Sequence, residues 1–169
     1  MTIPSEEPYA VDDGTVELVR LIRAADSLSR AEIGQRTGWA RVTVNQRLDR
    51  AVEAGLLEEI GTASSARGRP AARFAGNPNR AQILVADIGA SGMRLAATDL
   101  LGTILRRGDQ TIRIADGPDV VLDQVTTALQ SLQDPDVPLW GVGVSVPGPV
   151  EFATGTVVSP PIMTGWDGT

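Results

Sequence analysis

Three residue types with strong chemistry are missing from this 169-residue chain: it contains no cysteine, no histidine and no lysine. Without cysteine, disulfides and thiolate metal sites are excluded. Without histidine, the commonest general base and metal ligand is lost. These absences remove the commonest metal ligands and the commonest general base, and we expect no catalytic residue, no metal site and no cofactor in this chain.

Long hydrophobic runs are also missing. No apolar stretch approaches the roughly 20 residues that cross a bilayer, and the N-terminal MTIPSEEPYAVDDG lacks the charged-then-apolar pattern of a signal peptide. These absences predict a cytoplasmic chain that has no membrane partner. Hydrophobic residues make up 42% of the sequence, which at this length suits one large or two small globular domains.

The net charge differs in sign between sections of the chain. The net charge is −6, yet residues 1–14 carry −4, residues 15–80 carry +4 and residues 81–169 carry −6. A basic section flanked by acidic ones is typical of a nucleic-acid-binding domain joined to another domain.

The basic section predicts two short helices joined by a turn. Ser29 and Glu32 form a Ser-x-x-Glu capping box at the first helix, and Gly38 supplies the left-handed residue that ends it. The second helix is expected from about Arg41 to Ala54. Four apolar residues are expected on its inward face: Val44, Leu48, Ala51 and Val52. This pattern is typical of the DNA-binding helix-turn-helix, with a helix over 14–25 packed behind it.

Polar side chains remain for the outer face of the second helix. They are Arg41, Thr43, Asn45, Gln46 and Arg47. Arginine can donate twice to guanine, asparagine and glutamine can pair with adenine, and threonine can touch the thymine methyl. No acidic residue occurs from Gly34 to Leu48. We predict that this face reads the major groove of double-stranded operator DNA; the alternative is an ordinary solvated face.

Two strands are expected next, at about residues 56–60 and 71–75, with a small polar loop between them. Near the loop's end the sequence reads Arg67-Gly68-Arg69-Pro70. Such an extended segment is slim enough to enter a minor groove, and arginine is drawn to narrow, A·T-rich grooves. The strands therefore predict a wing whose Arg67, Gly68 and Arg69 contact DNA. The alternative is a flexible basic loop that touches only phosphates.

The character of the sequence changes after the turn cluster Gly76 to Asn79, where we place a domain boundary. Three successive strands are expected beyond it, as an antiparallel meander, followed by a helix, a strand and a small hairpin. These elements are placed at 82–89, 93–99, 103–112, 117–132, 139–146 and 150–158. The final SPPIMTGWDGT is expected to be irregular.

Motifs in this second half resemble a known family. Asp87-Ile88-Gly89-Ala90-Ser91, followed by Asp99-Leu100-Leu101-Gly102, resembles the first phosphate-binding motif of the superfamily of sugar kinases, heat-shock chaperones and actin. Together with the segment from Gly141 to Val150, the Gly165-Trp166-Asp167-Gly168 motif and the Gly-Arg-Pro wing, the chain resembles a transcriptional regulator of the ROK family (repressor, open reading frame, kinase), similar to the N-acetylglucosamine and xylose repressors. The resemblance runs from about Val16 onward.

The resemblance implies an α+β fold. A winged helix-turn-helix would be followed by the first, incomplete lobe of an actin-like, sugar-kinase (ribonuclease H-like) α/β domain. The expected limits are a flexible arm at 1–13, the DNA-binding domain at 14–78 and the truncated lobe at 79–169. Asp87, Gly89 and Ser91 would form a vestigial phosphate-binding site. The family pattern also implies a homo-oligomer, and a sugar or sugar-phosphate effector if the second lobe is present.

Two features depart from the family pattern. Ala40 stands where serine usually precedes the recognition helix, which removes a cap worth ~1 kcal/mol. The family's catalytic aspartate and its cysteine-rich and histidine-containing metal motif do not occur before Thr169. We therefore expect no enzyme activity and predict a sequence-specific transcriptional regulator, a repressor of sugar metabolism. The alternatives are a fragment of a ROK sugar kinase with an accessory DNA-binding head, and a pure oligomerisation module.

Overall fold

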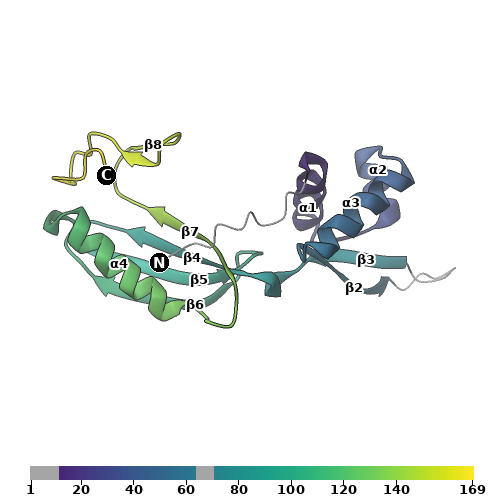
Figure 1. Cartoon of the computed structure of the whole chain (residues 1–169), viewed down its shortest axis with the longest axis horizontal. Helices are drawn as coiled ribbons and strands as arrows, with labels where there is room; N and C mark the ends of the chain where they lie inside the picture. The colour runs from purple at the N-terminus through teal and green to yellow at the C-terminus, as the bar shows by residue number, and fades with distance from the viewer. Residues whose placement is uncertain (1–11, 64–70) are drawn as a thin grey trace. The chain divides into compact units, whose positions relative to one another are not determined.

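The structure is a computed structural model that describes residues 12–63 and 71–169 (Figure 1). The chain divides into two compact units, Met1–Arg80 and Ala81–Thr169. Each unit has its own cluster of buried apolar side chains, and each is described by itself. Most of the expected arm and all of the expected wing tip, Arg67, Gly68 and Arg69, lie outside the described residues.

The first unit opens with three helices: α1 (Asp13–Ala24), α2 (Arg30–Thr37) and α3 (Arg41–Glu53). Helix α1 begins one residue earlier than predicted because Asp12 caps it, its carboxylate accepting a hydrogen bond from the Thr15 amide at 2.9 Å. The carboxylate of Asp12 also pairs with Arg50, in the last turn of α3. One aspartate therefore both starts α1 and ties it to α3.

The predicted capping box at the start of α2 is confirmed. The Ser29 hydroxyl accepts from the Glu32 amide at 3.3 Å, and the Glu32 carboxylate accepts from the Ser29 amide at 2.7 Å. Gly38 ends the helix with a φ of 70°, in the left-handed region that glycine adopts without strain. Each end of α2 is therefore set by a local signal.

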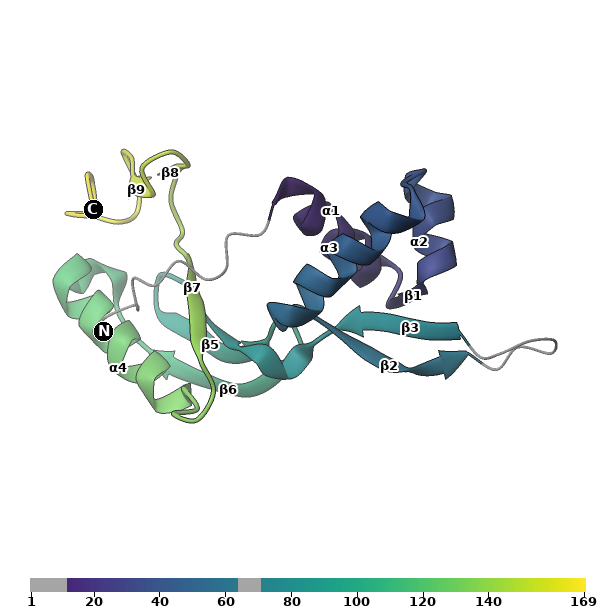
Figure 2. The same cartoon turned by 45° about the vertical axis from the view of Figure 1, so that its right-hand side comes forward.

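Three strands complete the first unit: β1 (Ser27–Ser29), β2 (Leu57–Ala63) and β3 (Ala71–Gly76). They form an antiparallel sheet in the order β1-β3-β2. Strands β2 and β3 run side by side away from the helices in both views (Figures 1 and 2). Strand β1 was not expected, because three residues carry too little pattern to indicate a strand and only pairing with β3 defines it.

The core of the first unit joins all three helices to the sheet. Its buried members are Leu18, Ile22, Leu28, Ile33, Val44, Leu48, Ala51, Leu57 and Phe74. The inward face predicted for α3 is confirmed at three positions and wrong at Val52, which is 40% exposed. The spacing of four and three residues from Val44 through Ala51 already fills the contact, and Val52 lies at its margin.

The second unit is built on a four-stranded sheet in the order β6-β5-β4-β7. Its strands are β4 (Gln82–Ile88), β5 (Gly92–Asp99), β6 (Ile104–Thr111) and β7 (Leu139–Ser145). The predicted antiparallel meander is confirmed, and β7 joins parallel to β4. Helix α4 (Pro118–Leu132) makes the crossover and lies along one face of the sheet (Figures 1 and 2). Two 3-10 turns, η1 (Pro78–Arg80) and η2 (Ile114–Asp116), precede β4 and α4.

The last part of the chain packs into the second unit's core. The predicted hairpin forms from β8 (Val150–Glu151) and β9 (Thr156–Val157). Beyond it, Trp166 is 1% exposed and its indole N–H donates to the Ile114 carbonyl at 3.1 Å. The terminal segment expected to be merely irregular is therefore anchored by a buried tryptophan. Across 12–63 and 71–169, no helix combines the length and apolarity that a membrane span requires.

Candidate functional site

Helix α3 presents part of the polar face that the sequence predicts. Arg41 and Gln46 are exposed, whereas Thr43, Asn45 and Arg47 are half-buried. Ala40 precedes the helix and provides no side-chain cap, and the first turn carries no acidic residue. Of the five side chains predicted for the outer surface of α3, only Arg41 and Gln46 are therefore fully available to an outside partner.

Arg47 does not point outward as expected. Its guanidinium lies over the Trp39 ring, 3.8 Å from the ring centroid, and its Nη1 is enclosed without a hydrogen-bond partner among the described residues. On the α1 side, a Cβ added to Gly14 would come within 2.2 Å of the guanidinium carbon. Stacking on the indole face is favourable for arginine, and Gly14 leaves the space. Arg47 thus joins α1, the turn and α3.

Asn45 is also less available than the sequence suggested. Its Oδ1 is enclosed and meets no hydrogen-bond partner in the described part of the chain. Pairing with adenine uses the amide oxygen and the amide nitrogen together. In this conformation Asn45 cannot offer both groups to an outside partner, whereas the exposed Gln46 can.

Val42 is a feature of α3 that the sequence reading missed. It lies in the first turn and is 66% exposed. It falls two residues before Val44, outside the buried spacing of the helix, and this offset was the signal that could have identified it. An exposed aliphatic group beside Arg41 and Gln46 has the chemistry that contacts a thymine methyl.

A hollow of about 820 Å³ lies where α2, α3 and β3 meet. Its lining comprises Ser29, Arg30, Ala31, Gly34, Trp39, Arg41, Val44, Ala71 and Ala72. The guanidinium of Arg30 lies 4.5 Å from the centroid of the Phe74 ring. With two arginines and no acidic residue in the lining, the hollow is suited to an anionic group.

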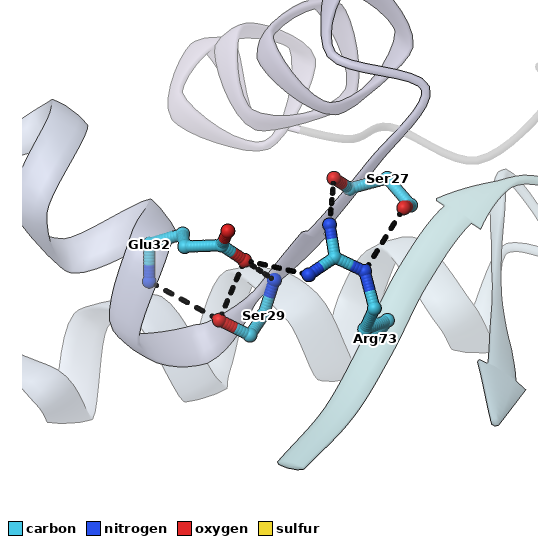
Figure 3. A network of polar contacts seen from close by, with 4 residues as sticks. All are labelled: Ser27, Ser29, Glu32 and Arg73. Atoms are coloured by element: carbon cyan, nitrogen blue, oxygen red, sulfur yellow. Dashed lines mark hydrogen bonds and ion pairs between the residues drawn. The ribbon is translucent and has the colours of Figure 1, made fainter. Parts of the chain in front are cut away.

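A polar network connects β3 to the start of α2 (Figure 3). Arg73 donates to the Ser27 hydroxyl at 3.1 Å, to the Ser27 carbonyl at 2.7 Å and to the Glu32 carboxylate at 3.1 Å. Hydrogen bonds from the Ser29 amide and hydroxyl, with the nearby arginine charges, lower the pKa of Glu32 below its ordinary value. The carboxylate that caps α2 is therefore ionised at neutral pH and available to Arg73.

In the second unit, the three residues of the expected phosphate motif lie around the turn between β4 and β5. The Asp87 carboxylate pairs with Arg94 at 2.5 Å. The Gly89 amide donates to the Gly92 carbonyl at 2.8 Å, and a Cβ at Gly89 would lie 3.1 Å from that oxygen. Ser91 is exposed. The turn therefore needs Gly89 to close on Gly92, and the Asp87 carboxylate is already paired with the Arg94 guanidinium.

A second hollow, of about 620 Å³, lies on the strands of this sheet. Its polar lining includes Asp87, Arg94, Arg107, Asp109 and Ser145. Within the described residues, no three carboxylates gather into a group that could hold a metal ion. In the register of this sheet, Arg94 lies between Asp87 and Asp109, so each of these carboxylates has an arginine on the neighbouring strand.

Comparison with known proteins gives the context of both units. No protein-family model matches the chain. A xylose repressor of Caldicellulosiruptor, described as putative, is 27% identical over 145 residues, which are 83% of this chain and 36% of that protein. A transcriptional regulator of Mycobacterium bovis is 32% identical over 160 residues, 92% of this chain and 36% of that protein. The chain thus spans little more than a third of the length of these relatives.

A solved structure gives the fold. The crystal structure of a ROK family transcriptional regulator, a homologue of the Escherichia coli Mlc protein, matches 92% of this chain and 40% of its own with a TM-score of 0.72 and 19% identity. The mixed α/β arrangement of the chain is therefore that of this regulator. The chain therefore has the fold of a ROK family transcriptional regulator and is similar in sequence to a xylose repressor and a transcriptional regulator, and it spans 36–40% of the length of these proteins.

Proposed function

We propose that the chain is a sequence-specific DNA-binding transcriptional regulator. In this proposal residues 14–78 form a winged helix-turn-helix domain, α3 is the recognition helix and the β2–β3 hairpin is the wing. The observation that carries it is the exposed face of α3, where Arg41, Val42 and Gln46 present base-reading chemistry on a helix fixed by α1 and α2.

Helix α3 has the packing that groove insertion requires. Val44, Leu48 and Ala51 are buried against the rest of the unit, so the opposite side of the helix is directed to solvent. Arg47 supports the helix through Trp39 and Gly14 instead of reading bases. The hollow beside Arg30 and Arg41 suits a backbone phosphate, and phosphate contacts fix the register of such a helix on the duplex.

The wing completes the proposed interface. Arg67, Gly68 and Arg69 remain predicted minor-groove contacts. Residues 1–11 remain a predicted arm, whereas Asp12 and Asp13, expected in that arm, cap and begin α1. For a protein of the relatives' length, we propose a homo-oligomer as the DNA-bound form. We propose a sugar or sugar phosphate as its effector, by similarity to relatives named as xylose repressors.

We further propose that residues 79–169 are the first lobe of a sensor domain and have no catalytic role. Asp87, Gly89 and Ser91 are taken as a vestigial phosphate site, because Arg94 neutralises the carboxylate best placed to hold metal-bound phosphate. An assay for sugar-dependent ADP release tests this proposal. Turnover above that of a heat-inactivated sample would favour the kinase alternative.

Duplex binding tests the proposed function directly. A duplex is first selected from randomised DNA with the full 169-residue chain, and its affinity is compared with that of random-sequence duplexes by fluorescence anisotropy at several salt concentrations. We expect tighter binding to the selected duplex, and an affinity that falls as salt rises because phosphate neutralisation releases counterions. Equal, weak binding to every duplex would refute the proposal.

Base reading is assigned to Gln46 more than to Asn45. Gln46→Ala should lower discrimination between selected and random duplexes by ~1–3 kcal/mol, the value of one bidentate base contact. Asn45→Ala should lower it less, because the Asn45 oxygen is enclosed. Gln35→Ala, an exposed glutamine on α2, is the matched control and should leave discrimination unchanged. If Gln46→Ala weakens binding to all duplexes equally, Gln46 contacts only phosphate.

A further inference from the structure

The β2–β3 hairpin bends at one position. The register between the strands shifts between Glu59 and Thr62, so that two residues of β2 lie opposite one residue of β3, Arg73. A bulge of this kind bends a strand and increases its local twist. The direction in which the outer part of the hairpin leaves the unit is therefore decided beside Arg73.

Arg73 is held at this bend from the other side of β3. Its guanidinium donates to both the hydroxyl and the carbonyl of Ser27 in β1, and to the carboxylate of Glu32 in α2 (Figure 3). The Arg73 side chain is 28% exposed, so these contacts are partly screened from water. Only a guanidinium presents a planar fork of donors that meets acceptors in three places, since the ammonium of lysine is a single point.

The network leads on to the proposed recognition helix. The Glu32 oxygen that meets Arg73 also accepts from the Ser29 amide, so it fixes the first turn of α2. Helix α2 in turn buries Ile33 in the core that contains Val44 and Leu48 of α3. A continuous set of contacts therefore runs from the bend of the hairpin, through the cap of α2, to α3.

We propose that Arg73 is a positioning residue for DNA binding, which holds the hairpin at its bulge so that the hairpin and α3 meet one duplex in a fixed geometry. This inference rests on the proposed function. It predicts a contribution to affinity from a side chain that touches no DNA, made through Ser27 and Glu32.

Two substitutions that change the charge in opposite directions distinguish a positioning role of Arg73 from direct contact with DNA. Arg73→Gln removes a positive charge, whereas Glu32→Gln removes a negative charge and should favour a polyanion if only electrostatics mattered. Glutamine can still complete the capping box with Ser29, so Glu32→Gln keeps the start of α2 while it removes the ion pair. Positioning predicts that both substitutions weaken DNA binding.

The experiment measures the affinity of the full chain for the selected duplex with Arg73→Gln, Glu32→Gln and the double variant. All measurements are made well below the melting temperature of each variant, with folding verified by far-UV circular dichroism. Arg23→Gln, at an exposed arginine in the last turn of α1, is the charge-matched control. Arg73→Lys keeps the charge of Arg73 and removes its fork.

We expect Arg73→Gln to weaken binding about tenfold and Glu32→Gln about fivefold, the scale of coupling between contacting residues. The double variant should be no weaker than Arg73→Gln alone, Arg73→Lys should not restore affinity, and the salt dependence should stay as in the wild type. Should Arg73→Gln fail to fold, a loss of affinity in folded Glu32→Gln supports the inference by itself.

Three results would overturn the inference. Opposite effects of the two single substitutions, with a salt slope lowered by about one in Arg73→Gln, would make Arg73 a phosphate contact. Additive losses would mean that the two residues act separately. Unchanged affinity in both variants, with the wild type bound to its selected duplex, would remove any role for the network. Failure of the wild type to bind DNA would instead refute the proposed function.

Discussion

Gln82 is completely buried at the first position of β4 and holds the loop between α4 and β7. Its Nε2 donates to the carbonyls of Asp134 and Val137, both at 2.7 Å, and its Oε1 accepts from the Asp134 amide at 3.0 Å. We predict that Gln82→Met, which keeps the length of the side chain and removes all three hydrogen bonds, lowers the stability of the second unit. At about 1 kcal/mol for each bond, the expected loss is ~2–4 kcal/mol.

Amide hydrogen exchange measured by mass spectrometry is the appropriate assay, because it resolves the two units within one chain. Exchange of slow amides in β4 and β5 should accelerate by about 30- to 1000-fold, the equivalent of that loss, whereas amides in α1 and α3 should keep their rates. Gln130→Met, at an exposed position of α4, is the control and should change little. Unchanged protection in Gln82→Met would refute the reasoning, since three buried hydrogen bonds would then contribute nothing net.

A charge variant adds a pH dependence to the same prediction. Gln82→Glu places a buried carboxylate against two carbonyl oxygens, so at neutral pH it should destabilise the second unit more than Gln82→Met does. Burial raises the pKa of such a carboxyl group, and its protonated form can donate one hydrogen bond. Part of the lost stability should therefore return as the pH is lowered.

Three further predictions concern other parts of the chain. Trp166→Phe should lower the stability of the second unit by ~1–2 kcal/mol in urea unfolding, because the Ile114 carbonyl loses its N–H donor; an unchanged midpoint would contradict this. Because the pKa of Glu32 is lowered in the folded state, its stabilisation is present at neutral pH and is lost as pH falls through its ordinary value toward the lowered one; Glu32→Gln should flatten acid unfolding of the first unit, and an identical acid profile would argue against it. Replacing Arg67 and Arg69 by lysine should weaken binding chiefly to duplexes with A·T-rich flanks, and an equal response to G·C-rich flanks would reduce the wing to a basic loop.

Features with a local cause were predictable from the sequence. The start of α2 follows from Ser29 and Glu32, which are three residues apart and satisfy each other's backbone groups. Its end follows from the conformation open to Gly38. The missing side-chain cap at Ala40 and the start of α4 at Pro118, directly after Gly117, also follow from local sequence, and the structure has both.

Features that depend on distant partners were not predictable. The position of Arg47 is set by Trp39 across the turn and by Gly14 on another helix, so helical periodicity alone left it on the outer face. The short strand β1 exists only through pairing with β3. Trp166 gave no periodic signal because a single anchored side chain has no repeat, and its site is completed by Ile114, 52 positions earlier.

The candidate site shows the same difference between local features and features that depend on distant partners. Chemistry that a residue carries by itself, as at Gln46 and Arg41, could be assigned from its type and its place on a helix. The role proposed for Arg73 could not, because it depends on acceptors in β1 and α2 and on a shift of register in β2.

The bulge opposite Arg73 also sets a rule for changes in hairpin length. Side chains alternate between the two faces of a strand, so one extra residue exchanges the faces of everything beyond it. Insertion or deletion of an even number of residues in β2 past Glu59 would preserve which side chains lie on each face of the hairpin, whereas an odd number would reverse them while leaving composition and charge almost unaltered. Evolution or engineering of this hairpin is therefore constrained by parity as well as by length, and two loops of equal charge that differ by a single residue are not equivalent.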